Sequence, residues 1–396
     1  MTENHLEKSR LVVAIVPSDT AAGRGEFRGI ADAAGRRGWT LEMIDRAVVG
    51  TDLLPFHALL ARADGIVARM GGAFADGTLG RLGVPVVGLD ATPAPGAWAC
   101  VTSDAKAIGT MAADELRSTP RASYVFVPML RRYHWTEGRG RAFLARIRKA
   151  GGNARLYAPQ TEWDWVGERE ALAQWLAALP RPIGIFAGND VLARFCLGAC
   201  HSAGLDVPRD AAILGADDDE ALCLATSPAL SSIRIDFEGM GRRAAELLEK
   251  AFARGVRPAR PPIISVPPLG VARRTSTLAL APGVDPRLTA GLDFIALHAC
   301  DPLVGVPDVA SAMGMGRRQA DRLFHAEGKT IREHLEETRL ARVQHLLRSS
   351  DATVRDIASE CGFSSETYLT RLFRRRCGVT PGGYRQGTAN APDAMS

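Results

Sequence analysis

The fold is decided by two related stretches near the end of the chain, Val306-Pro-Asp-Val-Ala-Ser-Ala-Met-Gly-Met-Gly-Arg-Arg-Gln-Ala-Asp-Arg-Leu-Phe324 and Val354-Arg-Asp-Ile-Ala-Ser-Glu-Cys-Gly-Phe-Ser-Ser-Glu-Thr-Tyr-Leu-Thr-Arg-Leu-Phe373. Each stretch starts a predicted helix with an acidic residue, an apolar residue and an alanine, and ends a second helix in Arg-Leu-Phe. Ala310 and Ala358 are small where two helices must cross closely, and Gly314 and Gly362 allow the positive φ of a tight turn. The pattern predicts a helix-turn-helix motif that is present twice.

A long helix is predicted over 330–348, between the two motifs. Its apolar residues recur near helical spacing, at Leu335, Leu340, Val343, Leu346 and Leu347. A rigid connector of this kind would hold two recognition helices in a fixed relation, and two major grooves on one face of DNA recur about 34 Å apart. The strand pattern is absent after about residue 288, so the last hundred residues predict a separate all-α domain.

Three segments around these motifs carry a family resemblance: Arg339-Leu-Ala-Arg-Val-Gln-His-Leu-Leu-Arg-Ser-Ser350, Ile357-Ala-Ser-Glu-Cys-Gly-Phe-Ser-Ser365 and Phe373-Arg-Arg-Arg-Cys-Gly-Val-Thr-Pro-Gly-Gly-Tyr-Arg385. They closely resemble the AraC/XylS DNA-binding signature over about 100 residues. The chain departs from that signature at Gly316, where a Ser or Thr N-cap is usual, and at Gly382 and Gly383. The resemblance implies a DNA-binding domain, in which Gly316 would weaken the first recognition helix.

The second helix of each motif is rich in arginine, and no acid lies between residues 371 and 385. Arginine binds phosphates and can pair with guanine through two hydrogen bonds. A solvated charged face is the alternative interpretation, but the doubled motif favours contact with DNA. The predicted DNA-contacting residues are Arg317, Arg318, Asp321, Arg322, Ser365, Glu366, Thr367, Thr370, Arg371 and Arg374. Arg375, Arg376 and Arg385 continue the basic run.

The first 270 or so residues alternate apolar runs with helical patterns. Buried strands are predicted at 11–16, 41–44, 65–68, 84–88, 123–127, 183–187 and 211–215. Strands that alternate with helices of 10–15 residues indicate a doubly wound parallel sheet, and the length favours two similar lobes. A proline-rich connection follows at 254–287, with one short strand at 263–266.

Gly188-Asn-Asp-Val-Leu-Ala, Gly215-Ala-Asp-Asp-Asp-Glu-Ala and the segment 227–241 resemble the effector-binding core of LacI/GalR repressors. The resemblance covers about residues 10–275 and implies a bilobal periplasmic-binding-protein fold. The predicted fold class is therefore α/β: a bilobal module of two doubly wound parallel sheets, followed by an all-α domain with two helix-turn-helix motifs. The predicted limits are 1–275 for the effector domain, 276–286 for a linker, 287–388 for the DNA-binding domain and 389–396 for a disordered tail.

A sugar site needs planar polar side chains and an aromatic face. The family resemblance implies such a site at Asp104, Arg139, Trp165, Asn189 and Asp217, with Arg24 as a candidate on the first loop. Trp163 could exchange roles with Trp165. Helix capping by Asn189 and solvation of Asp217 in its loop are the structural alternatives.

Other classes of site have weaker patterns. Gly23-Arg-Gly25-Glu-Phe-Arg-Gly29 has the wrong spacing for a dinucleotide fingerprint, and the consecutive acids Asp217 to Glu220 lack the alternate positions of a calcium loop. The histidines have no matched nucleophile or base partner. We therefore expect no cofactor, no metal and no enzyme activity.

Composition limits the location of the protein. The chain has 396 residues, a net charge of +5 and seven scattered cysteines without a CxxC pair. That cysteine usage is typical of reduced thiols in the cytoplasm. The absence of a run of about 20 apolar residues and of an export signal favours a cytoplasmic protein without a membrane span.

The combined pattern predicts a sugar-responsive transcription regulator that binds double-stranded DNA. Its resemblance to regulators of sugar catabolism implies a pentose effector, xylose foremost, and activation of transcription, with RNA polymerase as a further partner. A homodimer is expected because paired half-sites suit two-fold symmetry. The rival hypotheses are a sugar-binding transport component, which would need a signal peptide and no DNA-binding domain, and an α/β enzyme with a fused tail, which would need a catalytic set.

Overall fold

The computed structural model describes residues 9–49, 53–69, 79–90, 96–129, 134–160, 164–278 and 285–389. The chain forms two compact units. The first unit holds two six-stranded sheets and takes residues 1–206, 210–220 and 231–272. The second unit is helical and takes 207–209, 221–230 and 273–396. The sequence limits at 275, 287 and 388 remain predictions, and most of the predicted linker and tail lies outside the described residues.

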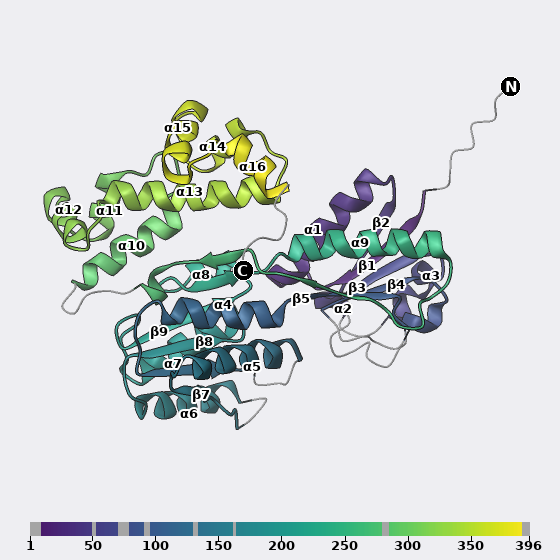
Figure 1. The fold of residues 1–396 in the computed structure, drawn as a ribbon, viewed down its shortest axis with the longest axis horizontal. Coiled ribbons are helices and arrows are strands. Elements are labelled where there is room, and N and C mark those ends of the chain that lie inside the picture. Colours follow the sequence, from purple (N-terminus) through teal and green to yellow (C-terminus); the bar gives the residue numbers. More distant parts are fainter. Residues whose placement is uncertain are drawn as a thin grey trace. The chain divides into compact units, whose positions relative to one another are not determined.

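The N-terminal lobe has a wholly parallel sheet in the order β11-β5-β4-β3-β1-β2. Its strands are β1 (Leu11–Val16), β2 (Thr40–Asp45), β3 (Gly65–Arg69), β4 (Val86–Leu89), β5 (Ala99–Ser103) and β11 (Ile263–Val266). Helices α1 (Ala21–Arg36) and α9 (Phe237–Arg254) lie side by side over this sheet (Figure 1). Short helices α2 (Arg46–Val49) and α3 (His57–Leu60) complete the lobe.

The C-terminal lobe has a sheet in the order β12-β10-β9-β8-β6-β7. Its strands are β6 (Ser123–Val127), β7 (Ala154–Leu156), β8 (Ile183–Ala187), β9 (Ala211–Ala216), β10 (Ser231–Arg234) and β12 (Gly270–Ala272), of which only β12 runs antiparallel to its neighbour. Its helices are α4 (Ala105–Arg117), α5 (His134–Lys149), α6 (Trp165–Ala177) and α7 (Asp190–Ser202). The central strands β6, β8 and β9 are buried along their whole length, which explains their continuous apolar runs.

These two sheets and the helices that follow confirm the predicted fold class. The sequence missed four short strands, β5, β7, β10 and β12. It also missed the short helices α2, α3 and α8 (Glu220–Leu224) and the last helix, Pro381–Ala389. Strands β7 and β12 have three residues each, and β7 is mostly exposed, so neither makes an apolar run. The antiparallel β12 is the one departure from two wholly parallel sheets among the described residues.

The all-α region contains α10 (Pro286–His298), α11 (Val306–Ala312), α12 (Arg317–Ala326), α13 (Ile331–Ser349), α14 (Val354–Glu360), α15 (Glu366–Cys377) and α16 (Pro381–Ala389). The predicted connector at 330–348 is α13. It contributes Ile331 and Leu335 to an apolar core with α10, α11 and α12, and Val343 and Leu347 to a second core with α14 and α15. Each helix-turn-helix motif therefore has its own core, and one helix joins the two.

Candidate functional site

Arg139 lies almost fully buried on α5, with 3% of its surface exposed. Its Nη1 donates a hydrogen bond to the carbonyl oxygen of Gly188 at 2.7 Å and pairs with Oδ1 of Asp217 at 3.4 Å. Its guanidinium carbon lies 4.6 Å from the centroid of the Trp135 ring, and its Nε has no protein partner among the described residues. α4 and α5 can approach closely here because Gly109 has no Cβ. A Cβ at this position would stand 2.2 Å from the carbonyl oxygen of Arg139.

Asp217 follows β9 in a left-handed backbone conformation, with φ of 111°, and Asp218 has φ of 54°. Such conformations cost about 1–3 kcal/mol and persist only where the surroundings impose them. Asp190 supplies that support: its carboxylate accepts hydrogen bonds from the Ser232 hydroxyl at 2.6 Å and from the Asp219 amide at 2.8 Å. Burial raises the pKa of the Asp217 carboxyl to about 6, although the Arg139 charge lowers it.

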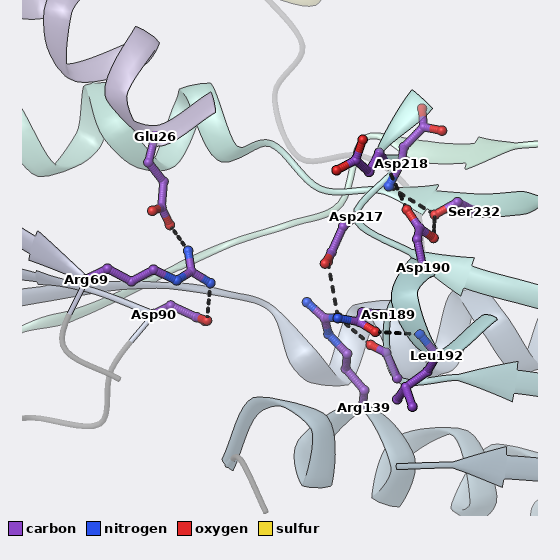
Figure 2. Close-up of polar contacts among 12 residues, drawn as sticks. Glu26, Arg69, Asp90, Arg139, Asn189, Asp190, Leu192, Asp217, Asp218 and Ser232 are labelled. Atoms are coloured by element: carbon purple, nitrogen blue, oxygen red, sulfur yellow. Dashed lines mark hydrogen bonds and ion pairs between the residues drawn. The ribbon is translucent and has the colours of Figure 1, made fainter. Parts of the chain in front are cut away.

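Asn189 is the N-cap of α7, and its Oδ1 accepts the Leu192 amide at 3.0 Å. That bond uses the side-chain oxygen alone, so capping and ligand binding are compatible at this residue. Arg139, Asn189 and Asp217 thus come from three separate segments and lie in one group, which Figure 2 shows together with Asp190 and Ser232. We call Arg139, Asn189, Asp190 and Asp217 the C-lobe cluster.

The other predicted effector residues have different contacts. Arg24 on α1 donates to the carbonyl oxygen of Ser18 at 3.1 Å and pairs with Asp219 at 3.3 Å. Asp104 caps α4 by accepting the Ala107 amide at 2.8 Å. Trp165 begins α6, is 41% exposed and meets Phe195 edge to face at 5.3 Å between centroids. Binding roles for Arg24, Asp104 and Trp165 stay predictions, and Trp163 lies outside the described residues.

The sequence analysis missed a second group, formed by Glu26, Arg69 and Asp90, which we call the N-lobe cluster. Arg69 ends β3 and forms ion pairs with the fully buried Glu26 of α1 and with Asp90, the latter at 2.7 Å. Glu26 Oε2 and Asp90 Oδ1 are buried without a hydrogen-bond partner in the described residues. Burial raises the pKa of Glu26 to about 7, against the lowering effect of the Arg69 charge. The position of Arg69 and Asp90 at the carboxyl ends of β3 and β4 could have indicated the cluster.

The two clusters face each other in Figure 2. The Arg69 charge lowers the pKa of Asp217, which places the clusters within electrostatic range of one another. Together they offer carboxylate oxygens, guanidinium nitrogens and an amide, and several of these buried atoms have no hydrogen-bond partner in the described part of the chain. Buried polar atoms are normally hydrogen-bonded, so such atoms suit a ligand with many hydroxyl groups.

The predicted DNA-contacting side chains lie on α12 and α15. Arg317, Arg318 and Arg322 are exposed on α12, and Arg317 pairs within that helix with Asp321 at 3.7 Å. Ser365 caps α15 by accepting the Tyr368 amide at 3.2 Å, so the structure shows a local role for it. A shallow hollow of about 630 Å³ is lined by Glu366, Thr367, Thr370, Arg371, Arg374, Arg375 and Thr380.

The described residues contain no group of three or more His, Cys, Asp or Glu side chains arranged to hold a metal ion. None of the helices in the described part of the chain is long and apolar enough to cross a membrane.

Comparison with known proteins matches two family profiles to the chain. Residues 117–277 match a periplasmic binding protein-like domain, and residues 309–387 match a helix-turn-helix domain. The xylose operon regulatory protein of Haemophilus influenzae is 28% identical over 72% of this chain and 74% of its own length. The protein of the same name from Escherichia coli K12 is 31% identical over 56% of each chain.

A solved structure of the xylose-binding transcription activator XylR covers 96% of this chain and 98% of its own, with a TM-score of 0.60 and 24% identity. At 24% identity, this likeness shows that the two chains share a fold.

These observations define the chain as a DNA-binding transcription regulator, with a sugar-binding module of periplasmic-binding-protein type before its helix-turn-helix domain. Within that class it is similar to the xylose operon regulatory proteins.

Proposed function

We propose that this regulator binds xylose or a closely related pentose between the N-lobe and C-lobe clusters, and that the sugar changes its action on DNA. The observation that carries the proposal is the set of buried polar atoms without a protein partner in the described residues: Glu26 Oε2, Asp90 Oδ1 and Arg139 Nε. A sugar hydroxyl both donates and accepts, so one ligand can satisfy carboxylate and guanidinium atoms together. The relatives named for the xylose operon favour a pentose.

The charges of the clusters favour an uncharged sugar. Glu26, Asp90, Asp190 and Asp217 contribute four carboxyl groups, whereas Arg69 and Arg139 contribute two guanidinium groups. The guanidinium groups are already paired with Glu26, Asp90 and Asp217. A sugar phosphate or sugar acid would bring a further negative charge beside these carboxylates, where like charges repel strongly because water is excluded.

A short segment offers a route from the sugar to the DNA-binding helices. Residues 221–230 follow directly after the loop of Asp217 and belong to the compact unit of α10 to α16. On α10, Asp293 accepts hydrogen bonds from the Ala229 amide at 3.0 Å, the Ser227 hydroxyl at 3.2 Å and the Thr275 hydroxyl. A change at Asp217 would therefore reach α10 through about ten residues of chain.

Several finer features belong to the same proposal. The protein acts in the cytoplasm. It acts as a homodimer, because DNA half-sites are commonly paired and a two-fold axis matches them. It activates transcription through RNA polymerase. The support for activation is that the solved structure with a related fold is described as a transcription activator. It is not an enzyme, because the relatives named above are transcription regulators.

A thermal-shift screen of the full chain against pentoses and hexoses tests the proposal. A bound ligand stabilises the folded state by mass action, by about 2.7 kcal/mol at one hundred times its dissociation constant. D-xylose or another pentose should raise the melting temperature at millimolar concentration, and the corresponding sugar acid and sugar phosphate should not. A shift with the anionic sugars alone would contradict the charge argument, and no shift with any sugar would contradict the effector assignment.

A further inference from the structure

Helix α13 and the second recognition helix, α15, are joined by a buried carboxylate. Glu336 on α13 is 8% exposed, and its Oε1 accepts the hydroxyl hydrogen of Tyr368 at 2.7 Å. A buried carboxylate is costly unless hydrogen bonds and charges satisfy it, so this contact holds Tyr368 in one place.

Two arginines complete the surroundings of this carboxylate. Arg332, one turn before Glu336, donates from Nε to Oε1 at 3.1 Å and from Nη2 to the Tyr368 hydroxyl oxygen at 3.2 Å. Arg375 of α15 lies 3.9 Å from Oε2. The Tyr368 hydroxyl therefore both donates and accepts, and its orientation is fixed from two sides.

The ring of Tyr368 continues this chain of contacts to the DNA face. The Arg371 guanidinium lies 5.6 Å from the centroid of the Tyr368 ring, within the range of a cation–π contact. The Tyr368 ring also lies near the ring of Phe363, with 6.1 Å between the two centroids. Arg371 itself lines the hollow on α15, together with other predicted DNA-contacting residues.

We propose that Glu336 and Tyr368 are positioning residues for sequence recognition by the second helix-turn-helix motif. Glu336 fixes Tyr368, and the Tyr368 ring supports Arg371 in the direction from which it reaches a base edge. Two hydrogen bonds from one guanidinium to a guanine require a fixed approach, whereas a phosphate contact tolerates a mobile side chain. Loss of the tyrosine–carboxylate contact should therefore reduce discrimination between sequences more than it reduces attraction to DNA.

Two conservative variants of the full chain test this proposal. Tyr368→Phe keeps the ring and removes the hydroxyl, and Glu336→Gln keeps the shape and removes the charge. Affinity is measured by fluorescence anisotropy on a duplex selected from random DNA by the wild-type chain, on the same duplex with the bases under the second motif replaced, and on unrelated DNA.

Each variant should weaken binding to the selected duplex by about tenfold and change binding to the other two by less than about twofold. The double variant should bind about as strongly as either single variant, because both substitutions weaken the same contact between tyrosine and carboxylate. Tyr384→Phe is the matched control: its hydroxyl also accepts from an arginine of α13, Arg348, but it lies on α16. That control should keep wild-type discrimination.

Other outcomes overturn the proposal. Equal weakening on all three duplexes would make the pair a purely structural or charge contact. Wild-type affinity for the selected duplex in both variants would show that Arg371 needs no support. Thermal unfolding of each variant is recorded beside the binding, and Glu336→Gln decides the matter if Tyr368→Phe lowers the melting temperature below the assay temperature.

Discussion

The arginines of the effector module and those of the recognition helices differ in their exposure to solvent. Arg139 is 3% exposed and is held by Gly188 and Asp217, whereas Arg317 and Arg375 have side chains that are each 68% exposed. A buried charge interacts strongly with a few fixed partners and is little screened by salt. An exposed charge attracts any phosphate and is screened. Under the proposed function, the same residue type would therefore serve ligand selection in the first region and salt-dependent affinity in the second.

The largest expected effect is that of Arg139→Ala on sugar binding. Removal of one partner of a buried ion pair costs about 3–5 kcal/mol, because the remaining charge is left unpaired. Calorimetry should find no heat of sugar binding in this variant, with sugar-free DNA binding retained. Arg146→Ala is the matched control, since Arg146 lies on the same helix but pairs with Asp114 near the surface. Wild-type sugar affinity in Arg139→Ala would place the ligand elsewhere.

The buried carboxyl of Glu26 should make the effector module sensitive to pH. Its pKa in the folded state is raised to about 7 from an ordinary value of 4.5. The folded state therefore holds more protons than the unfolded state between these values, and the free energy of unfolding should fall as the pH rises from about 4.5 to 7. The fall is on the order of 3 kcal/mol.

Glu26→Gln should remove much of that pH dependence, as measured by denaturant unfolding across the same range. Glu246→Gln serves as the control, because Glu246 pairs with Arg243 on the exposed side of α9. A stability that rises with pH through this window in the wild-type chain, or an unchanged slope in Glu26→Gln, would contradict the assignment.

On the DNA face, Arg371→Ala and Arg322→Ala should each weaken binding to a selected duplex by about 1–3 kcal/mol if the arginine reads a base. A phosphate contact behaves differently: its loss weakens binding to every sequence and reduces the salt slope by about 1. Titrations at several salt concentrations separate the two cases. Unchanged binding in both variants would remove α12 and α15 as recognition helices.

The smallest effect concerns the caps of the two recognition helices. Gly316 begins α12 without a side-chain hydrogen bond, whereas Ser365 caps α15. A Cβ at Gly316 would meet no atom within 4 Å, and its backbone is extended, with φ of −70° and ψ of 149°. Gly316→Ser should therefore stabilise the DNA-binding domain by a few tenths of a kcal/mol, and Ser365→Ala should destabilise it by about 1 kcal/mol. Thermal unfolding of the two variants compares them directly.

The helix-turn-helix domain could be predicted from sequence because its pattern is local. Each turn glycine, each small alanine and each run of arginines lies within about 20 residues of the others, and helical spacing places the arginines on an exposed face. The predicted connector at 330–348 and the observed α13 differ by a single residue at each end.

The proposed effector site was harder to predict because it is assembled from distant parts of the chain. Arg139, Asn189 and Asp217 were predicted from family resemblance. The structure brings them together because β9, β8 and β6 are adjacent in one sheet. Glu26, Arg69 and Asp90 belong to three segments that lie together only because β4, β3 and β1 are adjacent in the sheet. Arg69 and Asp90 stand at strand ends, but no local pattern marks Glu26. The left-handed backbone of Asp217 depends likewise on Asp190 and Ser232, which only the fold brings beneath it.

The central claim, that a sugar bound by the effector module controls DNA binding, is tested most directly by one titration. A labelled duplex selected by the full chain is titrated with wild-type protein in the absence and presence of saturating D-xylose, and again with Arg139→Ala. We expect xylose to change the dissociation constant of the wild-type complex by at least about fivefold, the lower end of typical coupling between two sites, and to leave that of Arg139→Ala unchanged. Equal dissociation constants for the wild-type complex with and without every pentose would contradict the account.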